Sequence, residues 1–99
     1  MKFQLTKSAL NDIRQITRHI RVIQGSPQNA RLVARRLRTH LRKLARMPGM
    51  GYQHDEIKDE VALVSGVTGL LVVYDPKTNP LLILRVLHPA RDLTKQRIR

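Results

Sequence analysis

The spacing of apolar residues changes from a helical period to a strand period near the middle of the chain. In the first half, one set of apolar residues recurs at steps of four and three, which is the spacing of a single helix face. Its members are Ala9, Ile13, Ile16, Ile20 and Ile23. Thr6 is a candidate N-cap, and Gly25 can end the helix in a left-handed conformation. A first helix is therefore predicted over about residues 7–24.

A second helix is predicted directly after Gly25. Ser26 followed by Pro27 is a start signal, because proline has no amide to leave unpaired in the first turn and its φ is already near helical. The apolar face of this helix consists of Ala30, Val33, Ala34, Leu37, Leu41 and Leu44. Pro48 breaks it. Since the joint is short, the two helices should lie antiparallel as a helical hairpin.

Three short apolar runs in the second half predict strands. They are VALVS at 61–65, LLVVY at 70–74 and LLILRVL at 81–87. β-Branched residues and bounding turn residues favour strands here, and the short connections favour antiparallel neighbours.

The segment KFQL at 2–5 is a candidate edge strand, whereas the basic segment at 94–99 is expected to take no part in a core. The expected fold is α+β, with an N-terminal helical hairpin packed on a small antiparallel sheet of three to four strands. The length predicts a single domain over residues 1–99.

The chain is strongly basic. Nineteen Lys and Arg residues against seven Asp and Glu residues give a net charge of +12 at pH 7. Such a surface attracts polyanions, so nucleic acid, a nucleic-acid machine or an acidic protein are the candidate partners. The cations are concentrated before residue 55, where Asp12 is the only acid.

Several functional classes find no support in the sequence. No cysteine is present, which favours a reducing compartment and predicts a cytoplasmic protein. No apolar run approaches the ~20 residues that span a bilayer, so no membrane association is expected. The four histidines lack the spacing of a zinc site, and no glycine-rich phosphate loop follows a strand. We expect neither a metal nor a cofactor.

Five motifs occur in an order typical of a known toxin superfamily. They are LTKSALNDIRQI in the first predicted helix, PGMG at 48–51, DEIK at 55–58, VVY at 72–74, and ILRVLH at 83–88 with RDL at 91–93. Over about residues 3–93 the chain resembles the ParE/RelE superfamily of type II toxin-antitoxin systems, and its last block is typical of the ParE branch. The resemblance implies a toxin that inhibits DNA gyrase, blocks replication, and is neutralised by a cognate acidic antitoxin in a hetero-oligomeric complex.

The RelE branch offers an alternative activity, the cleavage of mRNA on the ribosome. Its chemistry requires acid, base and charge-stabilising groups, which Arg85, His88 and Arg91 could supply. Strict strand alternation, however, puts Arg85 on the face with Ile83 and Leu87, and His88 on the opposite face, unless a bulge intervenes. No tyrosine follows residue 74. A binding inhibitor is therefore favoured over a nuclease, and both readings stay open.

Two groups of cations are the candidate binding residues. Arg85, His88 and Arg91 follow the last apolar run and are predicted to bind the target. Pairing of Arg85 with an acid such as Asp92 explains that arginine equally well, because an unpaired buried guanidinium is costly. The second group forms a stripe on the second helix that is predicted to bind the antitoxin, against the alternative of an ordinary solvated face. It consists of Arg31, Arg35, Arg38 and Arg42.

Overall fold

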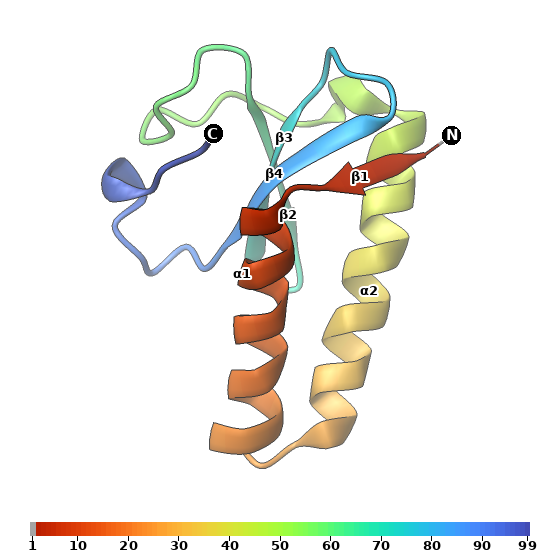
Figure 1. The fold of residues 1–99 in the computed structure, drawn as a ribbon, viewed down its shortest axis with the longest axis vertical. Helices are drawn as coiled ribbons and strands as arrows, with labels where there is room; N and C mark the ends of the chain where they lie inside the picture. The colour runs from red at the N-terminus through yellow and green to blue at the C-terminus, as the bar shows by residue number, and fades with distance from the viewer. Residues whose placement is uncertain (1) are drawn as a thin grey trace.

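The computed structural model describes residues 2–99, in which two helices pack against one face of a mixed sheet (Figure 1). The elements in chain order are β1 (Phe3–Leu5), α1 (Lys7–Arg18), α2 (Pro27–Arg46), β2 (Leu63–Val67), β3 (Leu70–Asp75) and β4 (Leu81–Leu87). A π-helical turn at His19–Ile23 continues α1. The α+β fold with its helical hairpin is confirmed.

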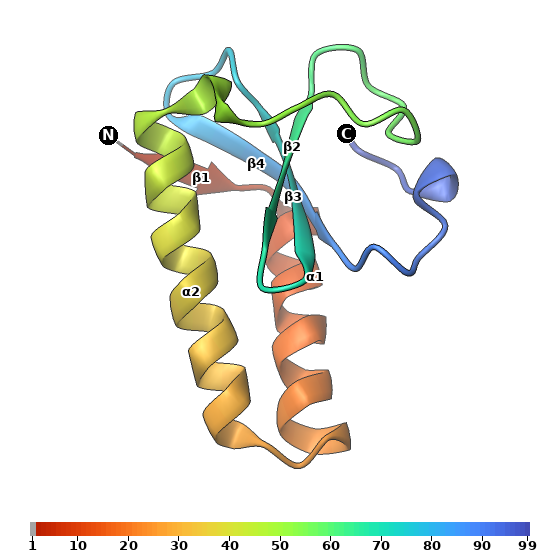
Figure 2. The ribbon, with the colours of Figure 1, turned by 180° about the vertical axis from the view of Figure 1, so that it is seen from behind.

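The predicted helix signals act as expected. The Thr6 hydroxyl accepts a hydrogen bond from the Ala9 N–H at 3.0 Å, which caps α1. Gly25 has a φ of +66°, a conformation that favours glycine and ends the first helix. Ser26 then caps α2, with Pro27 at its first position. The joined ends of the two helices extend beyond the sheet (Figures 1 and 2).

The sheet formed within residues 2–99 has the strand order β1-β4-β3-β2. β2, β3 and β4 form an antiparallel meander, as predicted. β1, however, pairs parallel with β4, from Phe3 opposite Leu81 to Leu5 opposite Ile83. The expectation of a wholly antiparallel sheet is therefore wrong. The hairpin of helices returns the chain to the end of the sheet where β1 starts, so the third meander strand runs in the same direction as β1.

β4 contains a bulge that changes which side chains share a face. Val73 lies opposite Arg85, but the next residue, Tyr74, lies opposite Ile83, so Leu84 has no partner on β3. Ile83 and Val86 both join the core beneath the helices, whereas Leu84 and Leu87 face the other side. The strict alternation assumed for residues 83–88 is wrong at this bulge.

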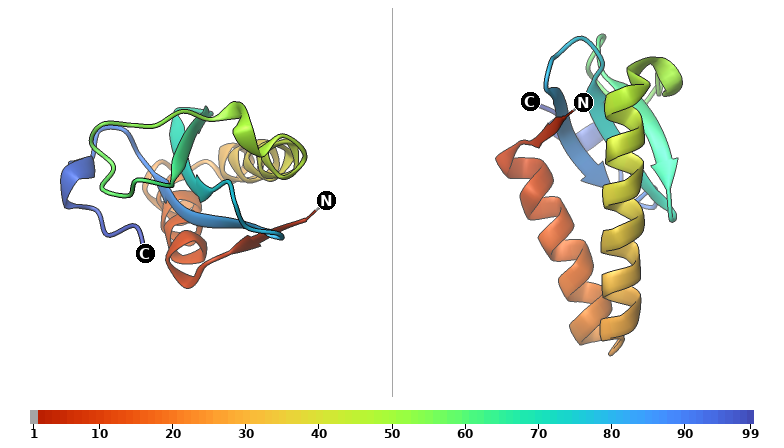
Figure 3. Two further views of the ribbon diagram at one scale, coloured as in Figure 1. Left: turned by 90° about the horizontal axis from the view of Figure 1, so that it is seen from above. Right: turned by 90° about the vertical axis from the view of Figure 1, so that its right-hand side faces the viewer.

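The face of the sheet that the helices leave open has a core of its own. Val64, Val73, Leu84 and Leu87 pack there against Ile57, Ala62, Leu93 and Ile98. The loop before β2 and the chain after β4 together cover this face (Figure 3).

The C-terminal segment contributes directly to this second core. The side chain of Ile98 is only 6% exposed. Arg99 binds the carboxylates of Asp59 and Asp75 at 2.6 and 2.9 Å. The expectation that residues 94–99 join no core is wrong, because a sheet with two apolar faces needs a cover on each. In the part of the chain described, no helix is long and apolar enough to cross a membrane.

Candidate functional site at the end of β4

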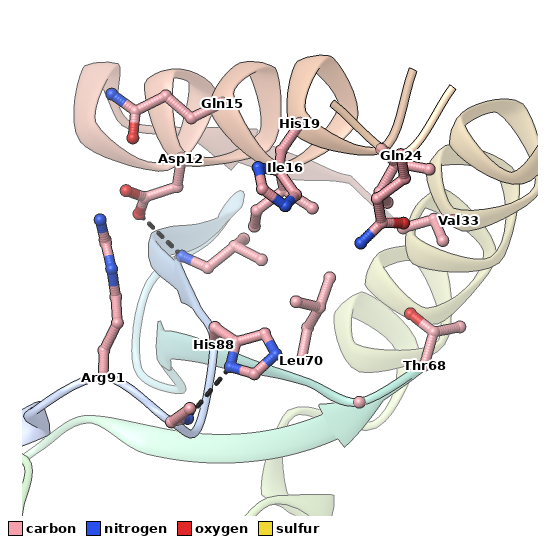
Figure 4. Close-up of a pocket in the computed structure, with 14 residues that line it drawn as sticks. Asp12, Gln15, Ile16, His19, Gln24, Val33, Thr68, Leu70, His88 and Arg91 are labelled. Carbon is pink, nitrogen blue, oxygen red and sulfur yellow. Dashed lines mark hydrogen bonds between the residues drawn. The ribbon is translucent and has the colours of Figure 1, made fainter. Parts of the chain in front are cut away.

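A cavity of about 660 Å³ lies between the hairpin and the C-terminal end of β4 (Figure 4). Apolar side chains line its interior: Ile16, Ile20, Val33, Leu70 and Val86. Polar groups lie among them, chiefly Gln15, His19, Gln24, Thr68, His88 and Arg91. This volume and this mixture of apolar walls with a few polar groups are typical of binding sites. The π-helical turn supplies His19 and Ile20, and such turns often occur at functional sites.

Asp12 and Arg85 fix the end of β4 to α1. The Asp12 carboxylate accepts hydrogen bonds from Nε and Nη2 of Arg85 at 2.7 and 2.9 Å, and from the Val86 N–H at 3.0 Å. The Asp12 and Arg85 side chains are 5% and 13% exposed. Hydrogen bonding to Asp12 raises the pKa of Arg85, which keeps the guanidinium charged.

Arg85 also holds the C-terminal segment. Its Nη1 donates to the Arg97 carbonyl at 2.6 Å, so each guanidinium nitrogen has a partner within the protein. The expected acid partner, Asp92, is the wrong one. Asp92 instead accepts from the Thr94 N–H and lies 3.9 Å from the Lys95 ammonium. Arg85 therefore shapes the edge of the site from within.

His88 is exposed and hydrogen-bonded to its own loop. Its Nδ1 accepts from the Ala90 N–H at 3.1 Å. A ring nitrogen that accepts a hydrogen bond has no proton, so the neutral ring carries its proton on Nε2. The free edge of His88 is thus a hydrogen-bond donor. An Nε2–H suits an acceptor on a partner and does not suit the role of general base.

Arg91 supplies a permanent positive charge to the cavity rim. Its side chain is exposed, and it forms no ion pair with any acid in residues 2–99. Figure 4 shows Arg91 and His88 on the β4 side of the cavity, with His19 and Gln24 on the helix side. The structure therefore brings His88 and Arg91 to one rim, and it places Arg85 behind them in an internal network.

The predicted antitoxin stripe is exposed along α2. Arg31, Arg35, Arg38 and Arg42 are all exposed, and within the described chain none of them pairs with a carboxylate. Exposed apolar side chains follow at the C-terminal end of this helix, at Met47, Met50 and Tyr52. The stripe and the cavity are separate surfaces, since of these four arginines none lines the cavity.

A family model matches residues 3–93, and its description is the ParE toxin of type II toxin-antitoxin system, parDE. The chain belongs to the ParE toxin family. It is therefore the toxin component of a type II toxin-antitoxin system, a class in which an antitoxin is the toxin's partner. A search of curated proteins finds no match to this ParE-family chain.

Sequence reasoning missed the acid that organises the site of this ParE-family toxin. Asp12 lies on the apolar face of the first helix, three residues after Ala9 and four before Ile16. An acid at such a position needs a buried cation, and Arg85 was the one cation inside an apolar strand. An acid on an apolar helix face and a cation inside an apolar strand could therefore have been predicted to pair with each other. No sequence pattern marked Gln15, His19 and Gln24, which join the site only through the packing of the hairpin on the sheet.

Proposed function

We propose that this ParE-family toxin inhibits DNA gyrase by binding it through the cavity rim at the end of β4, and so blocks replication. The observation that carries the proposal is the His88–Ala90 hydrogen bond, which leaves the Nε2–H of His88 as a donor on the cavity that Arg91 also lines. Donors around an apolar hollow form a docking surface for acceptor groups on a partner. Arg85 supports this surface from inside and does not contact the target itself.

The same observation ranks gyrase inhibition above RelE-type mRNA cleavage. A ribonuclease needs a base with a free lone pair directed at the ribose hydroxyl. In His88 the lone pair of the neutral ring lies on Nδ1, where the Ala90 N–H occupies it. Arg85, the second residue of the suggested nuclease set, has its donors engaged by Asp12 and Arg97. Binding without covalent chemistry is the reading that these contacts support.

A purified supercoiling assay tests the target. Gyrase, relaxed plasmid and ATP are incubated with increasing amounts of the full toxin, and the topoisomers are resolved on a gel. We expect supercoiling to stop as toxin approaches saturation. A translation reaction with ribosomes and labelled mRNA runs in parallel. Unimpaired supercoiling together with cleavage of the ribosome-bound message would reverse the ranking of the two functions.

For the antitoxin, the proposed contact is the α2 stripe of Arg31, Arg35, Arg38 and Arg42. Acidic side chains of a cognate antitoxin would neutralise these cations, and Met47, Met50 and Tyr52 offer the apolar anchors that a stable interface needs. The resulting cytoplasmic complex would be hetero-oligomeric.

Charge reversal tests this interface. R35E/R42E should lower the affinity for the acidic antitoxin at least about tenfold, because like charges then face each other across the interface. R14E/R18E on α1 is the matched control, since it changes the net charge by the same amount at exposed positions that form no ion pair within residues 2–99. Affinity for the antitoxin is measured by calorimetry. Equal losses of affinity in the two variants would show that the stripe is not part of the interface.

A further inference from the structure

A second hollow lies between α2 and the end of β2, and it shares Thr68 with the first cavity. It has a volume of about 330 Å³, and α2 forms most of its wall. The lining consists of Arg35, Arg36, Thr39, His40 and Lys43 from α2, with Val67 and Thr68 from the end of β2 and the turn after it. Three permanently charged residues and two threonines thus line one groove, and none of the described residues that line it is an acid.

The three cations lack internal partners. Arg35, Arg36 and Lys43 are exposed, and none forms an ion pair within residues 2–99. The sequence between residues 13 and 54 holds no acid at all. Like charges one helical turn apart destabilise a helix, so this concentration does not serve the stability of α2. It is explained by an external anion.

The groove is held on a rigid base. Nε2 of His40 hydrogen-bonds to Oγ of Ser65 at 2.8 Å, which ties α2 to β2. Burial, with a smaller effect from Lys43, lowers the pKa of His40, so the ring is neutral and serves as a link. Arg36, His40 and Lys43 follow at steps of four and three and therefore share one flank of the helix. The two cations on this flank project from a fixed surface.

Thr68 closes the groove in a conformation that threonine rarely adopts. Its φ is +47°, and the following Gly69 has a φ of +76°. A β-branched residue is costly there, by roughly 1–2 kcal/mol. Thr68 is thereby held at the end of the hairpin, where it lines both this groove and the first cavity. Strain of this kind occurs preferentially where a side chain has a task.

Charge favours a polyanion as the ligand of this groove. Among the described residues that line it, Val67 is the one apolar residue, whereas a protein partner needs large apolar or aromatic anchors. The aliphatic parts of the side chains form most of the groove's surface, so the exposed charged ends of Arg35, Arg36 and Lys43 are the groups that can meet phosphate oxygens. The groove contains no aromatic ring on which an unpaired base could stack. Duplex DNA, with its closely spaced phosphates and stacked bases, is the anion that fits best.

We propose that this groove, formed by Arg35, Arg36, Thr39, Lys43 and Thr68, binds the phosphate backbone of double-stranded DNA. The inference does not depend on the gyrase proposal, because the contact requires only the toxin and DNA. Three cations would displace about three counterions, and the contact carries no sequence preference. A gyrase-directed toxin with this groove would be retained on the substrate of its target.

Fluorescence anisotropy with a labelled duplex of about 20 base pairs tests the proposal across a series of salt concentrations. The logarithm of the binding constant should fall linearly with the logarithm of salt concentration, with a slope of about −2.7 or steeper for three phosphates. R36A/K43A should reduce the size of the slope by about 1.8 and weaken binding at low salt at least about tenfold. Melting curves establish that R36A/K43A and the control variant R14A/R18A both fold.

R14A/R18A on α1 is the matched control, with the same loss of charge at exposed positions outside the groove. Its slope should change by less than half as much as that of R36A/K43A. Equal changes of slope in the two variants would show that only the net charge matters, and would overturn the proposal. The proposal would also be overturned if the wild-type toxin bound no duplex at low salt, or if it bound single-stranded RNA of the same length more tightly than the duplex.

The outcomes separate this inference from the proposed function. If the toxin inhibits gyrase but does not bind DNA, the proposal that the groove binds DNA is wrong and the assignment of gyrase as the target is unaffected. One that binds DNA with the expected slope but leaves supercoiling intact overturns the target assignment alone.

Discussion

Asp12 in α1 and Arg85 in β4, 73 residues apart in sequence, are joined by two hydrogen bonds of 2.7 and 2.9 Å. The same carboxylate accepts from the Val86 N–H, just beyond the residues that β1 pairs with on β4. β1 therefore covers the first part of the β4 edge, and α1 covers the part that follows. The pair connects the first helix, the last strand and the C-terminal segment near the proposed target surface.

Removal of Asp12 should destabilise the protein severely. Asp12→Ala leaves the largely buried Arg85 guanidinium without its counter-charge and leaves the Val86 N–H without a partner. The free energy of unfolding should fall by about 3–5 kcal/mol, as expected when one member of a buried ion pair is lost. Urea denaturation followed by circular dichroism measures it. A loss below about 1 kcal/mol would mean that the pair contributes no more than an exposed one.

The double variant D12L/R85M is the companion test. It replaces both charges with apolar side chains, so no buried charge remains unpaired, and it should recover part of the loss of Asp12→Ala. Recovery should stay incomplete, because the Val86 N–H and the Arg97 carbonyl still lose their partners. A double variant less stable than Asp12→Ala would contradict this account.

His88 and Arg91 should affect target inhibition without affecting stability. Both side chains are exposed, so H88A/R91A should change the free energy of unfolding by less than about 0.5 kcal/mol. The toxin concentration that halves gyrase supercoiling should rise at least about tenfold, as for the loss of interface anchors. R14A/R18A on α1 provides the comparison, since neither residue lines the cavity and this variant loses one positive charge more than H88A/R91A. An unchanged inhibitory concentration in H88A/R91A would exclude this rim from the target interface.

Substitution of Thr68 should stabilise the toxin. Both central residues of the turn between β2 and β3 have positive φ, and Asn-Gly is the sequence that such hairpin turns prefer. Thr68→Asn should therefore raise the free energy of unfolding by about 0.5–1 kcal/mol, measured in urea. Thr68→Val keeps the branch at Cβ and should bring no gain. A destabilised T68N variant would show that the threonine side chain contributes more than its backbone costs.

The attachment of Arg99 should depend on pH. The hydrogen bond from Arg99 holds the pKa of Asp59 below its usual 3.8. For Asp75, burial raises the pKa, but the Lys77 N–H and Arg99 together lower it below 3.8. Both carboxylates therefore stabilise the fold fully above that pH, and their contribution is lost as the pH falls through their lowered values.

Arg99→Gln tests that dependence. It should cost about 1 kcal/mol at pH 7, a modest amount because the Arg99 side chain is 43% exposed and solvent screens the pair. The difference from the wild type should vanish as the pH falls from 7 through the lowered pKa values of the two acids, below 3.8. Urea midpoints measured across this range provide the comparison. A difference that persists in acid would assign the contribution of Arg99 to packing.

The sequence predicts the helices of this fold well because their signals are local. Thr6, Gly25 and Ser26 each act within one helical turn, and the apolar stripe needs no knowledge of the partner surface. Pairing between distant segments is not encoded in this way. The parallel match of Phe3 with Leu81 and the extra residue Leu84 in β4 depend on how the hairpin returns to the sheet.

The candidate site was predictable to a similar extent. The apolar run that ends in His88 and Arg91 marked the rim, because polar groups directly after a buried strand must reach the surface. The role of Arg85 was not predictable from its neighbours, since the acid nearest in sequence, Asp92, caps its own turn and the partner lies in α1. The buried position of Ile98 was hidden by the basic residues around it.

The parallel pairing of β1 with β4 sets a late step in the biosynthesis of this toxin. Phe3 leaves the ribosome well before its partner, Leu81, which is made 78 residues later. The two helices can form early, because their contacts are local, while β1 waits until β4 has been made. A chain arrested before residue 81 would carry a helical hairpin but lack the surface that ends at β4. Premature arrest should therefore release harmless fragments.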